Sequence, residues 1–366
     1  MKKLVSLLLA LVMLFALTAC GAKTEEATAP EAAPAEAADP NPPAEAADGA
    51  VDLSGEDYYN WTMSTSQQEN TWYSALMDEF AALVEERTEG HITITVHHNN
   101  TLGSPEDIFN GMVTGTIDVV NLGMSQAGSF PVSDITQVPF LCNDAYEAEA
   151  VLNALYDAGY MKEYTDNGYQ LLAFHPTDTQ MICLVDDQVQ SISDFAGLNI
   201  RVNSGSIVSA VEAFGASAVS ITTTEVYMAL TTGVVDGAVS SPAAMKAFSF
   251  QDACEYLYQV PLAIGSNYLC VSDISWNALS PELQAIVKGV ADELQPKYME
   301  ENIKAMNEAI ATFKTAYNPT DEALTAMQEA TGFIRDEWAA NLTAQGYDGE
   351  AIMALAEQTL AEYRAS

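Results

Sequence analysis

Arg201 stands at the end of a short apolar segment, and its side chain is well suited to binding an anion without covalent chemistry. The segment is residues 197–202, of which 199–202 are predicted to form a strand. A planar guanidinium matches the two oxygens of a carboxylate and stays charged at any relevant pH. The chain holds only 13 Lys and Arg, and open α/β sheets bind ligands beyond the carboxyl ends of their strands, so this arginine is conspicuous. A buried salt bridge to a nearby acid is the alternative role, because an unpaired buried charge is costly.

Polar side chains follow two other predicted strands and are expected to face the same cleft. Ser66, Gln67 and Asn70 follow the first strand, and residues 123–125, which end in Ser125, follow the third. Both groups would also suit ordinary turns and helix caps.

Four aromatic residues are candidates for the apolar walls of such a cleft, although aromatic side chains at these positions belong more often to the core. They are Trp72, Phe140, Tyr227 and Trp276. Tyr227 lies in a predicted helix and is expected to pack.

No catalytic or metal site is predicted. His97 and His98 are adjacent on a predicted strand, so their side chains point to opposite faces and cannot share a metal ion. His91 and His175 are isolated and are expected to be structural. Neither a Gly-x-Ser-x-Gly elbow nor a His-Glu-x-x-His pair occurs, so the sequence predicts no enzyme and no cofactor.

The cysteines after the amino-terminal segment are predicted to be mostly buried thiols. Cys142, Cys183, Cys254 and Cys270 contain no Cys-x-x-Cys pair and lack the density of a disulfide scaffold. A single bridge between Cys254 and Cys270 is the alternative.

The alternation of predicted strands and helices indicates an α/β protein. In the first half, strands are predicted at 58–63, 91–97 and 117–122, with helices at 72–84 and 105–113. The second of these helices has an N-cap at Ser104 and a proline at its first position.

The second half continues the alternation from about residue 178. Strands are predicted at 181–185 and 199–202, a short helix at 193–197, a capping box from Thr222 to Glu225 before a helix at 226–230, and a turn into a strand at 233–238. A long helix is predicted from Ser280 to about residue 316, where Pro296 should kink or divide it.

The first residues predict export. Lys2 and Lys3 precede an apolar run at 4–17, and small residues surround Cys20. This pattern predicts a signal peptide at 1–19 with lipid attached to Cys20, whereas cleavage nearby without lipidation is the alternative. The run is shorter than the roughly 20 residues that span a bilayer, so no membrane helix is expected.

Residues 20–52 are predicted to tether the folded part to the membrane surface. After Cys20 they are rich in Ala, Glu and Pro and contain no aromatic residue, so they cannot bury enough surface to fold. The remaining 310 or so residues are enough for two domains. The net charge of −38 argues against nucleic acid or anionic lipid as a partner.

Two linked motifs carry a resemblance to a known family. Residues 197–202 are Gly-Leu-Asn-Ile-Arg-Val, and residues 224–237 are Thr-Glu-Val-Tyr-Met-Ala-Leu-Thr-Thr-Gly-Val-Val-Asp-Gly. With supporting stretches at 90–96, 102–103, 115–118, 139–141 and 276–279, the chain resembles the DctP-like substrate-binding subunits of tripartite ATP-independent periplasmic (TRAP) transporters. The resemblance covers about residues 58–300, and the second motif is its most specific part.

The resemblance implies a fold of the periplasmic-binding-protein type (class II), in which two α/β lobes are joined by crossover strands and bridged by a long helix. The expected lobes are 53–177 with about 267–305, and 178–266 with about 306–366. It also implies that Arg201 grips the ligand's carboxylate. Ligand contacts are expected from Arg201, Ser240, Ser241, Gln180, Ser66, Gln67, Asn70, Ser125, Trp72 and Phe140.

The chain departs from the family pattern at two places. The second arginine that many members carry about 20 residues before the first is absent, and residues 179–182 read Thr-Gln-Met-Ile. The usual Gln-Glu-Asn-Pro after Val-Asp-Gly is replaced by Ala-Val-Ser-Ser-Pro. Both changes remove polar or charged contacts and favour a monocarboxylate or an acid of different shape.

The predicted function is therefore capture of a small organic acid outside the cell membrane and its delivery to an ion-gradient-driven TRAP permease. The partners expected are this anion, the integral-membrane permease subunits and, through lipid alone, the membrane. A lipoprotein that binds sugars or peptides for an ABC transporter is the alternative.

Overall fold

The structure is a computed structural model that describes residues 52–123, 129–186, 189–202 and 205–366. The predicted signal peptide, Cys20 and residues 21–51 of the predicted tether lie outside the described residues, as does Ser125. Within the described ranges, no helix is both long and apolar enough to cross a membrane.

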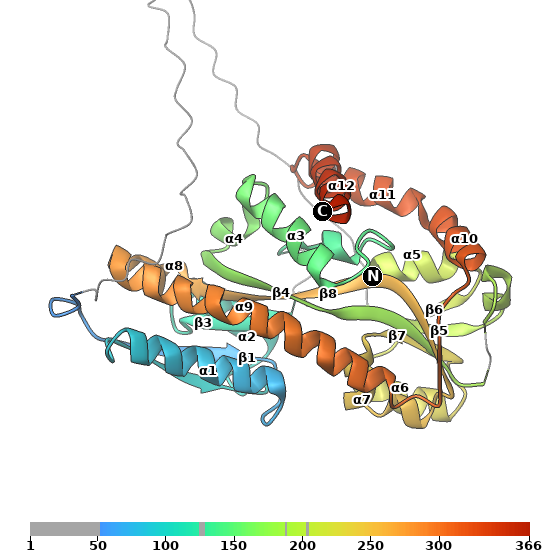
Figure 1. The fold of residues 1–366 in the computed structure, drawn as a ribbon, viewed down its shortest axis with the longest axis horizontal. Helices are drawn as coiled ribbons and strands as arrows, with labels where there is room; N and C mark the ends of the chain where they lie inside the picture. Colours follow the sequence, from blue (N-terminus) through green and yellow to red (C-terminus); the bar gives the residue numbers. More distant parts are fainter. Residues whose placement is uncertain (1–51, 124–128, 187–188, 203–204) are drawn as a thin grey trace, which may run out of the picture. The chain divides into compact units, whose positions relative to one another are not determined.

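All strands of the described ranges belong to one mixed sheet with the order β2-β1-β3-β8-β4-β7-β5-β6, and β9 pairs with β8 (Figure 1). The strands are β1 (Tyr59–Thr65), β2 (Ile92–His97), β3 (Val119–Gly123), β4 (Tyr169–Leu184), β5 (Asn199–Val202), β6 (Ser217–Ser220), β7 (Gly237–Ser240), β8 (Tyr256–Ser272) and β9 (Thr315–Tyr317).

Two groups of parallel strands are joined by the two longest strands of the sheet. β1 pairs in parallel with β2 and β3, and β5 pairs in parallel with β6 and β7. Between the groups, β4 and β8 run antiparallel to each other, and β8 pairs with β3 of the first group while β4 pairs with β7 of the second. The register of β4 against β8 shifts between Pro176 and Thr179, where the strands pass from one group to the other.

Helices cover the two parallel groups. They are α1 (Trp72–Arg87), α2 (Pro105–Thr114), α3 (Ala145–Asp157), α4 (Glu163–Asp166), α5 (Gly205–Ala213), α6 (Thr223–Thr231), α7 (Pro242–Ala247), α8 (Asp273–Asn277), α9 (Pro281–Ile310), α10 (Asp321–Thr331), α11 (Phe333–Ala344) and α12 (Gly349–Ala365). Short 3-10 helices are η1 (Ser133–Gln137), η2 (Ile192–Phe195) and η3 (Phe250–Asp252).

Helix α9 spans both groups. Figure 1 shows it running alongside β4 and β8 from α1 at one end to α7 at the other, and it contacts all three of α1, β4 and α7. It continues as one helix through Pro296, so the predicted division at this residue is wrong. Buried side chains on both sides of the proline, Leu294 before it and Tyr298 after it, hold the helix against the sheet. The helix also ends earlier than predicted, because residues 315–317 pair with β8 as β9.

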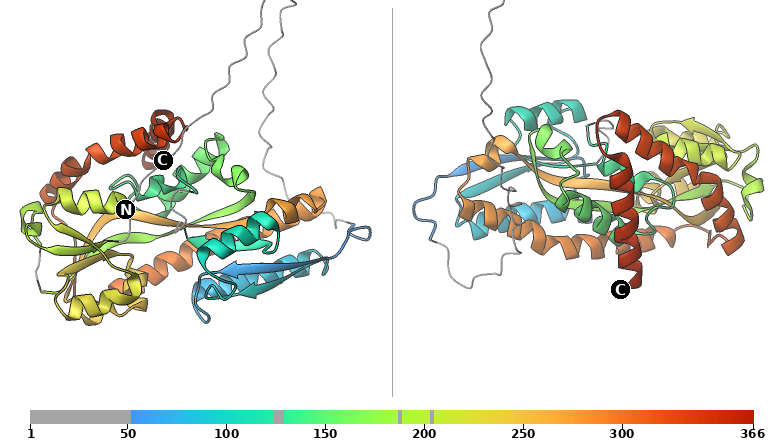
Figure 2. Two further views of the ribbon diagram at one scale, coloured as in Figure 1. Left: turned by 180° about the vertical axis from the view of Figure 1, so that it is seen from behind. Right: turned by 90° about the horizontal axis from the view of Figure 1, so that it is seen from above.

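The carboxyl-terminal helices return to the first half of the chain. Helix α10 contacts α5, whereas α12 packs along α3, and Figure 2 shows this return from two further sides. Arg364 on α12 makes an ion pair with the buried Glu147 on α3, 2.7 Å between nitrogen and oxygen. Residues 306–366 therefore touch both parallel groups, and the lobe boundaries given above stay predictions.

Local sequence signals account for most helix starts. Ser104 and Asp107 form a reciprocal capping box at α2, and Thr71 and Ser74 form one at α1. At α6 the predicted capping box is wrong: the Thr222 hydroxyl donates to the Glu225 carboxylate, and it accepts no backbone N–H. Thr222 is nonetheless the N-cap residue of α6, and the helix begins at Thr223, three residues before the predicted start.

All four described cysteines are buried free thiols, which confirms the principal prediction. The alternative bridge between Cys254 and Cys270 is wrong. Strand β8 runs between them, and at roughly 3.3 Å per residue it separates the two sulfur atoms by several tens of ångströms. A disulfide needs Cα atoms within about 7 Å of each other.

His175 is buried in a polar network beside α9. Its Nδ1 lies 2.9 Å from the Tyr73 hydroxyl and 3.2 Å from Asn121 Nδ2, and its ring stacks on Tyr298 at 4.2 Å between centroids. The Tyr298 hydroxyl donates in turn to the backbone oxygen of Pro176, at 2.8 Å. Burial lowers the pKa of His175 to about 3, so the ring is neutral in the folded protein at any pH near neutrality.

This neutral histidine predicts loss of stability in acid. The unfolded chain takes up a proton at about pH 6.5, whereas the folded protein does so only near pH 3, so His175 stabilises the fold above pH 6.5 and this contribution falls away between the two values. The slope in that window is at most about 1.4 kcal/mol per pH unit. We expect His175→Asn to flatten it in urea titrations run from pH 7 to pH 4.

The difference between the pH slopes of the wild type and of His175→Asn isolates the contribution of this histidine to stability. Asp134 and Asp178 have pKa values raised to about 6, and Glu163 to about 7, mainly by burial. These acids favour folding at low pH and so contribute slopes of the opposite sign, but equally in both proteins. Identical slopes would show that His175 titrates normally in the folded state.

Candidate functional site

A cavity of about 990 Å³ lies where the two parallel groups meet. Its walls come from the crossover strands and from both sides of them. The crossover strands β4 and β8 contribute Thr177, Gln180, Gly265, Ser266 and Asn267, and the first half contributes Ser66, Gly123, Asp134 and Gln137. The second half contributes Gly205, Ser206, Thr223, Ser240, Ser241, Ala244 and Phe248. Helix α11 and its end contribute Trp338, Asn341, Leu342 and Gln345.

Arg201 lies behind the wall of this cavity, on β5, and only 2% of its surface is exposed. Its Nε donates to the backbone oxygen of Ile221 at 2.9 Å, and Nη1 donates to that of Val239 at 3.3 Å. Nη2 donates to the hydroxyl of Thr223 at 3.0 Å, and Thr223 lines the cavity. Neutral acceptors therefore hold the guanidinium, and one of them, Thr223, lies in the cavity wall.

No carboxylate of the described residues lies within ion-pair distance of Arg201. Every other arginine of the described ranges, and every lysine except the exposed Lys162, pairs with an acid within 4 Å. A guanidinium has five N–H donors, and three have partners, so two have no acceptor among the described residues. Desolvation by burial lowers the pKa of Arg201, but an arginine still stays charged. Two free donors on a buried cation suit the oxygens of an anion.

The Val235-Asp236-Gly237 motif fixes the strands beside Arg201. The Asp236 carboxylate accepts from the backbone N–H of Asn199 at 2.7 Å, which anchors the start of β5. Gly237 opens β7 so close to β4 that a Cβ there would lie 2.5 Å from the backbone oxygen of Cys183. The motif thus sets how β5 and β7 lie against the crossover strand.

A second cavity, of about 770 Å³, adjoins the first and shares Ser66 and Ser241 with it. Three residues predicted for the site, Gln67, Asn70 and Trp72, line this second cavity. The predicted residues of the first strand's loop therefore come to the cleft, but on the side of α1 and α9.

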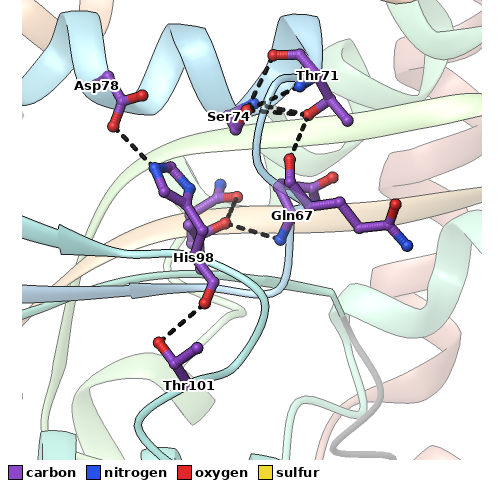
Figure 3. A network of polar contacts seen from close by, with 9 residues as sticks. Gln67, Thr71, Ser74, Asp78, His98 and Thr101 are labelled. Atoms are coloured by element: carbon purple, nitrogen blue, oxygen red, sulfur yellow. Dashed lines mark hydrogen bonds and ion pairs between the residues drawn. The ribbon is translucent and has the colours of Figure 1, made fainter.

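The loop after β1 is held by bonds within the first half, as Figure 3 shows. The N–H of Gln67 donates to the Thr65 hydroxyl at 3.1 Å, and Asn99 donates to the backbone oxygen of Gln67 at 2.9 Å. Thr71 donates to the backbone oxygen of Gln68 at 3.0 Å, while His98 contacts Asp78 at 2.9 Å. The loop is thus fixed from β2 and from the start of α1.

The other predicted residues are divided between cavity and core. Gln180, Ser240 and Ser241 line the first cavity, where Ser241 also caps α7 by accepting from Ala244 N–H at 3.3 Å. Phe140 lines neither cavity. Its ring packs toward Phe214, 6.4 Å between centroids, in the core of the second half.

Two acids at the cleft were missed by sequence reasoning. Asp134 lines the first cavity from η1, and Asp178 lines the second from β4, where it accepts from Ala243 N–H at 2.8 Å. Asp134 belongs to no motif. Asp178 sits inside a strand that the sequence suggested only from residue 181. Across the described ranges, no cluster of three or more His, Cys, Asp or Glu could hold a metal ion.

Comparison with known proteins gives a family. The model of the bacterial extracellular solute-binding proteins, family 7 (DctP), matches residues 63–341. A solute-binding protein of Chromohalobacter salexigens is 23% identical over 277 residues, which are 71% of this chain and 82% of the relative. The 2,3-diketo-L-gulonate-binding periplasmic protein of Escherichia coli is 26% identical over 231 residues, 63% and 70% of the two chains.

Solved structures share the fold. A TRAP periplasmic solute-binding protein from Ochrobactrum anthropi superposes with a TM-score of 0.75 at 24% identity, covering 84% of this chain and 97% of its own. One from Chromohalobacter salexigens, with bound D-glucuronate, gives 0.72 at 20% identity, covering 82% and 99%. The predicted two-lobed α/β fold is confirmed. The chain therefore belongs to the DctP family of bacterial extracellular solute-binding proteins, which bind and transport substrates and are not enzymes.

Proposed function

We propose that the protein captures a small organic acid outside the cell membrane through Arg201 and delivers it to a TRAP-type permease. The observation that carries this proposal is the buried guanidinium, which has two N–H donors without an acceptor among the described residues and no acid of those residues beside it. A ligand carboxylate would accept both donors at once, and such charge-assisted pairs are about twice as strong as neutral hydrogen bonds.

The ligands named for similar proteins support an organic acid as the ligand of this protein. The Escherichia coli relative binds 2,3-diketo-L-gulonate, and similar solved structures hold D-glucuronate and orotic acid. Each of these molecules carries one carboxylate. This chain offers one buried arginine at the cleft and has Gln180 near the position where a second arginine is common, which favours a monocarboxylate.

Closure of the two halves over the ligand would follow from the placement of the cavity. Its lining comes from both halves, with Ser66 on one side and Ser240 on the other. A ligand that contacts both halves stabilises the closed form, because it binds that form more tightly than the open one. The closed form would then dock on the permease.

Lipid on Cys20 would anchor the protein to the outer face of the membrane, with residues 21–52 as the tether. Cys20→Ala should release the protein from membrane pellets into the soluble extracytoplasmic fraction. Retention of the variant in the pellet would count against the anchor.

The ligand can be found by native mass spectrometry of the freshly purified protein, followed by thermal-shift screening of organic acids beside their neutral amides. We expect acids alone to raise the melting temperature. Stabilisation by neutral sugars or peptides would favour the ABC-type alternative instead, and so would a neighbouring gene for an ATPase.

A further inference from the structure

The cavity in front of Arg201 contains a hydrogen-bond acceptor that no described group satisfies. Gln180 lies on β4, is only 4% exposed, and lines the cavity. Its side-chain oxygen is buried and accepts no hydrogen bond among the described residues. Leaving such a group unpaired costs about 1–3 kcal/mol. Buried polar groups normally have partners, so this oxygen is available to a donor on a ligand.

An acid faces the same cavity from another element. Asp134 lies in η1, which packs on β8 and α3, and it is the one lining side chain of the described residues with a formal charge. No described lysine, arginine or histidine approaches its carboxylate within 4 Å, and no described N–H or O–H donates to it. Burial raises its pKa to about 6, as expected for a carboxylate without a partner.

The polar groups without a described partner at this site are therefore of two kinds, hydrogen-bond donors and hydrogen-bond acceptors. The N–H donors of Arg201 without a described acceptor favour an anionic group on the ligand. Gln180 and Asp134 favour a hydrogen-bond donor, and the negative charge of Asp134 favours a positively charged donor. A ligand hydroxyl would serve Gln180 but would not balance the charge of Asp134. A second carboxylate would meet Asp134 as a like charge, which excludes dicarboxylates by repulsion.

We infer that the ligand is a zwitterion whose carboxylate is held by Arg201 and whose ammonium group is received by Asp134 and Gln180. The inference rests on the proposed function and narrows its substrate class from organic acids to amino acids, amino-sugar acids and related compounds. A cation at this position also reduces the opposition of the chain's strongly negative charge to binding an anion.

The test compares ligands that differ in one group. Calorimetry would measure 5-aminopentanoate, 5-hydroxypentanoate and glutarate, then 4-amino-, 4-hydroxy- and 4-carboxycyclohexanecarboxylate, and finally uronates beside amino-sugar acids. In each series we expect the ligand with the ammonium group to bind at least about tenfold more tightly than the ligand with the hydroxyl group. The ligand with a second carboxylate should bind most weakly. If no series favours the ammonium group, the inference is overturned.

Asp134→Asn tests the residue itself. The amide keeps the shape of the side chain and removes its charge, so the preference for ammonium over hydroxyl should shrink to about threefold or less. Asp157→Asn, which removes an exposed charge at the end of α3, should leave the preference as in the wild type. An unchanged preference in Asp134→Asn would overturn the assignment. Should that variant not fold, the wild-type series alone decides.

Failure of the inference can be told apart from failure of the proposed function. Converting each carboxylate to a carboxamide tests Arg201 alone. If acids bind and amides do not, but ammonium confers no advantage, only the zwitterion is wrong. If acids and amides bind alike, the proposed function is wrong as well.

Discussion

Replacing Arg201 with glutamine should weaken ligand binding by about 2–3 kcal/mol, or roughly 30- to 150-fold. Glutamine can keep one or two bonds to the neutral acceptors around it, but it has neither the charge nor the two parallel donors that a carboxylate requires. Isothermal titration calorimetry with the ligand identified from the purified protein gives the change directly. Circular dichroism and melting curves would establish that the variant remains folded.

Arg87→Gln is the matched control for this change. It removes the same guanidinium from an exposed ion pair with Glu293, where about half of each side chain faces solvent. Exposed pairs of this kind contribute little, so affinity and stability should both stay near the wild-type values. Equal affinity of Arg201→Gln and Arg87→Gln would remove Arg201 from the binding site.

Gly237→Ala should lower the free energy of unfolding by about 3 kcal/mol. The new methyl carbon would lie 2.5 Å from the backbone oxygen of Cys183, and backbone cannot move aside as a flexible side chain can. Strand β7 would have to shift away from β4, and it would take Ser240 and the neighbouring β5 with it. Urea denaturation followed by circular dichroism measures the loss, and ligand affinity should fall as well.

The same glycine-to-alanine substitution at Gly289 should raise the free energy of unfolding, whereas Gly237→Ala should lower it. Gly289 lies on the exposed side of α9, and no atom lies within 4 Å of where its Cβ would be. Alanine favours a helix interior over glycine by about 0.5–1 kcal/mol, so this variant should be more stable than the wild type. If both variants were destabilised equally, the close approach of β7 to β4 would not be the cause at Gly237.

Local sequence signals predicted most strands of the parallel groups, although not β6, because each signal depends on nearby residues. Strand β5 was predicted with its observed bounds, and the start of α2 followed from Ser104 with the proline after it. The crossover strands were predicted only in part. β4 is buried along nearly all of its 16 residues, so it shows no alternation of polar and apolar side chains, and it includes Pro176. Its first half pairs with a segment almost a hundred residues away, which no local pattern records.

The site shows the same division. Gln180, Ser240 and Ser241 line one cavity as predicted from strand ends and family motifs, and the buried Arg201 contacts Thr223 in its wall, although their role in binding stays a prediction. Asp134 could not be predicted. It reaches the cavity because the 3-10 helix that carries it packs on β8, a contact set by tertiary structure alone.

The pairing of the two crossover strands determines whether the protein can be divided into fragments that fold separately. Because β8 pairs with β3 of the first group, β4 pairs with β7 of the second, and β4 and β8 pair with each other, neither half owns a complete sheet. A fragment limited to one half would expose the backbone N–H and C=O groups of a long, apolar strand edge, which is a template for aggregation. The halves are therefore not separable modules, and the ligand cleft exists only in the intact chain.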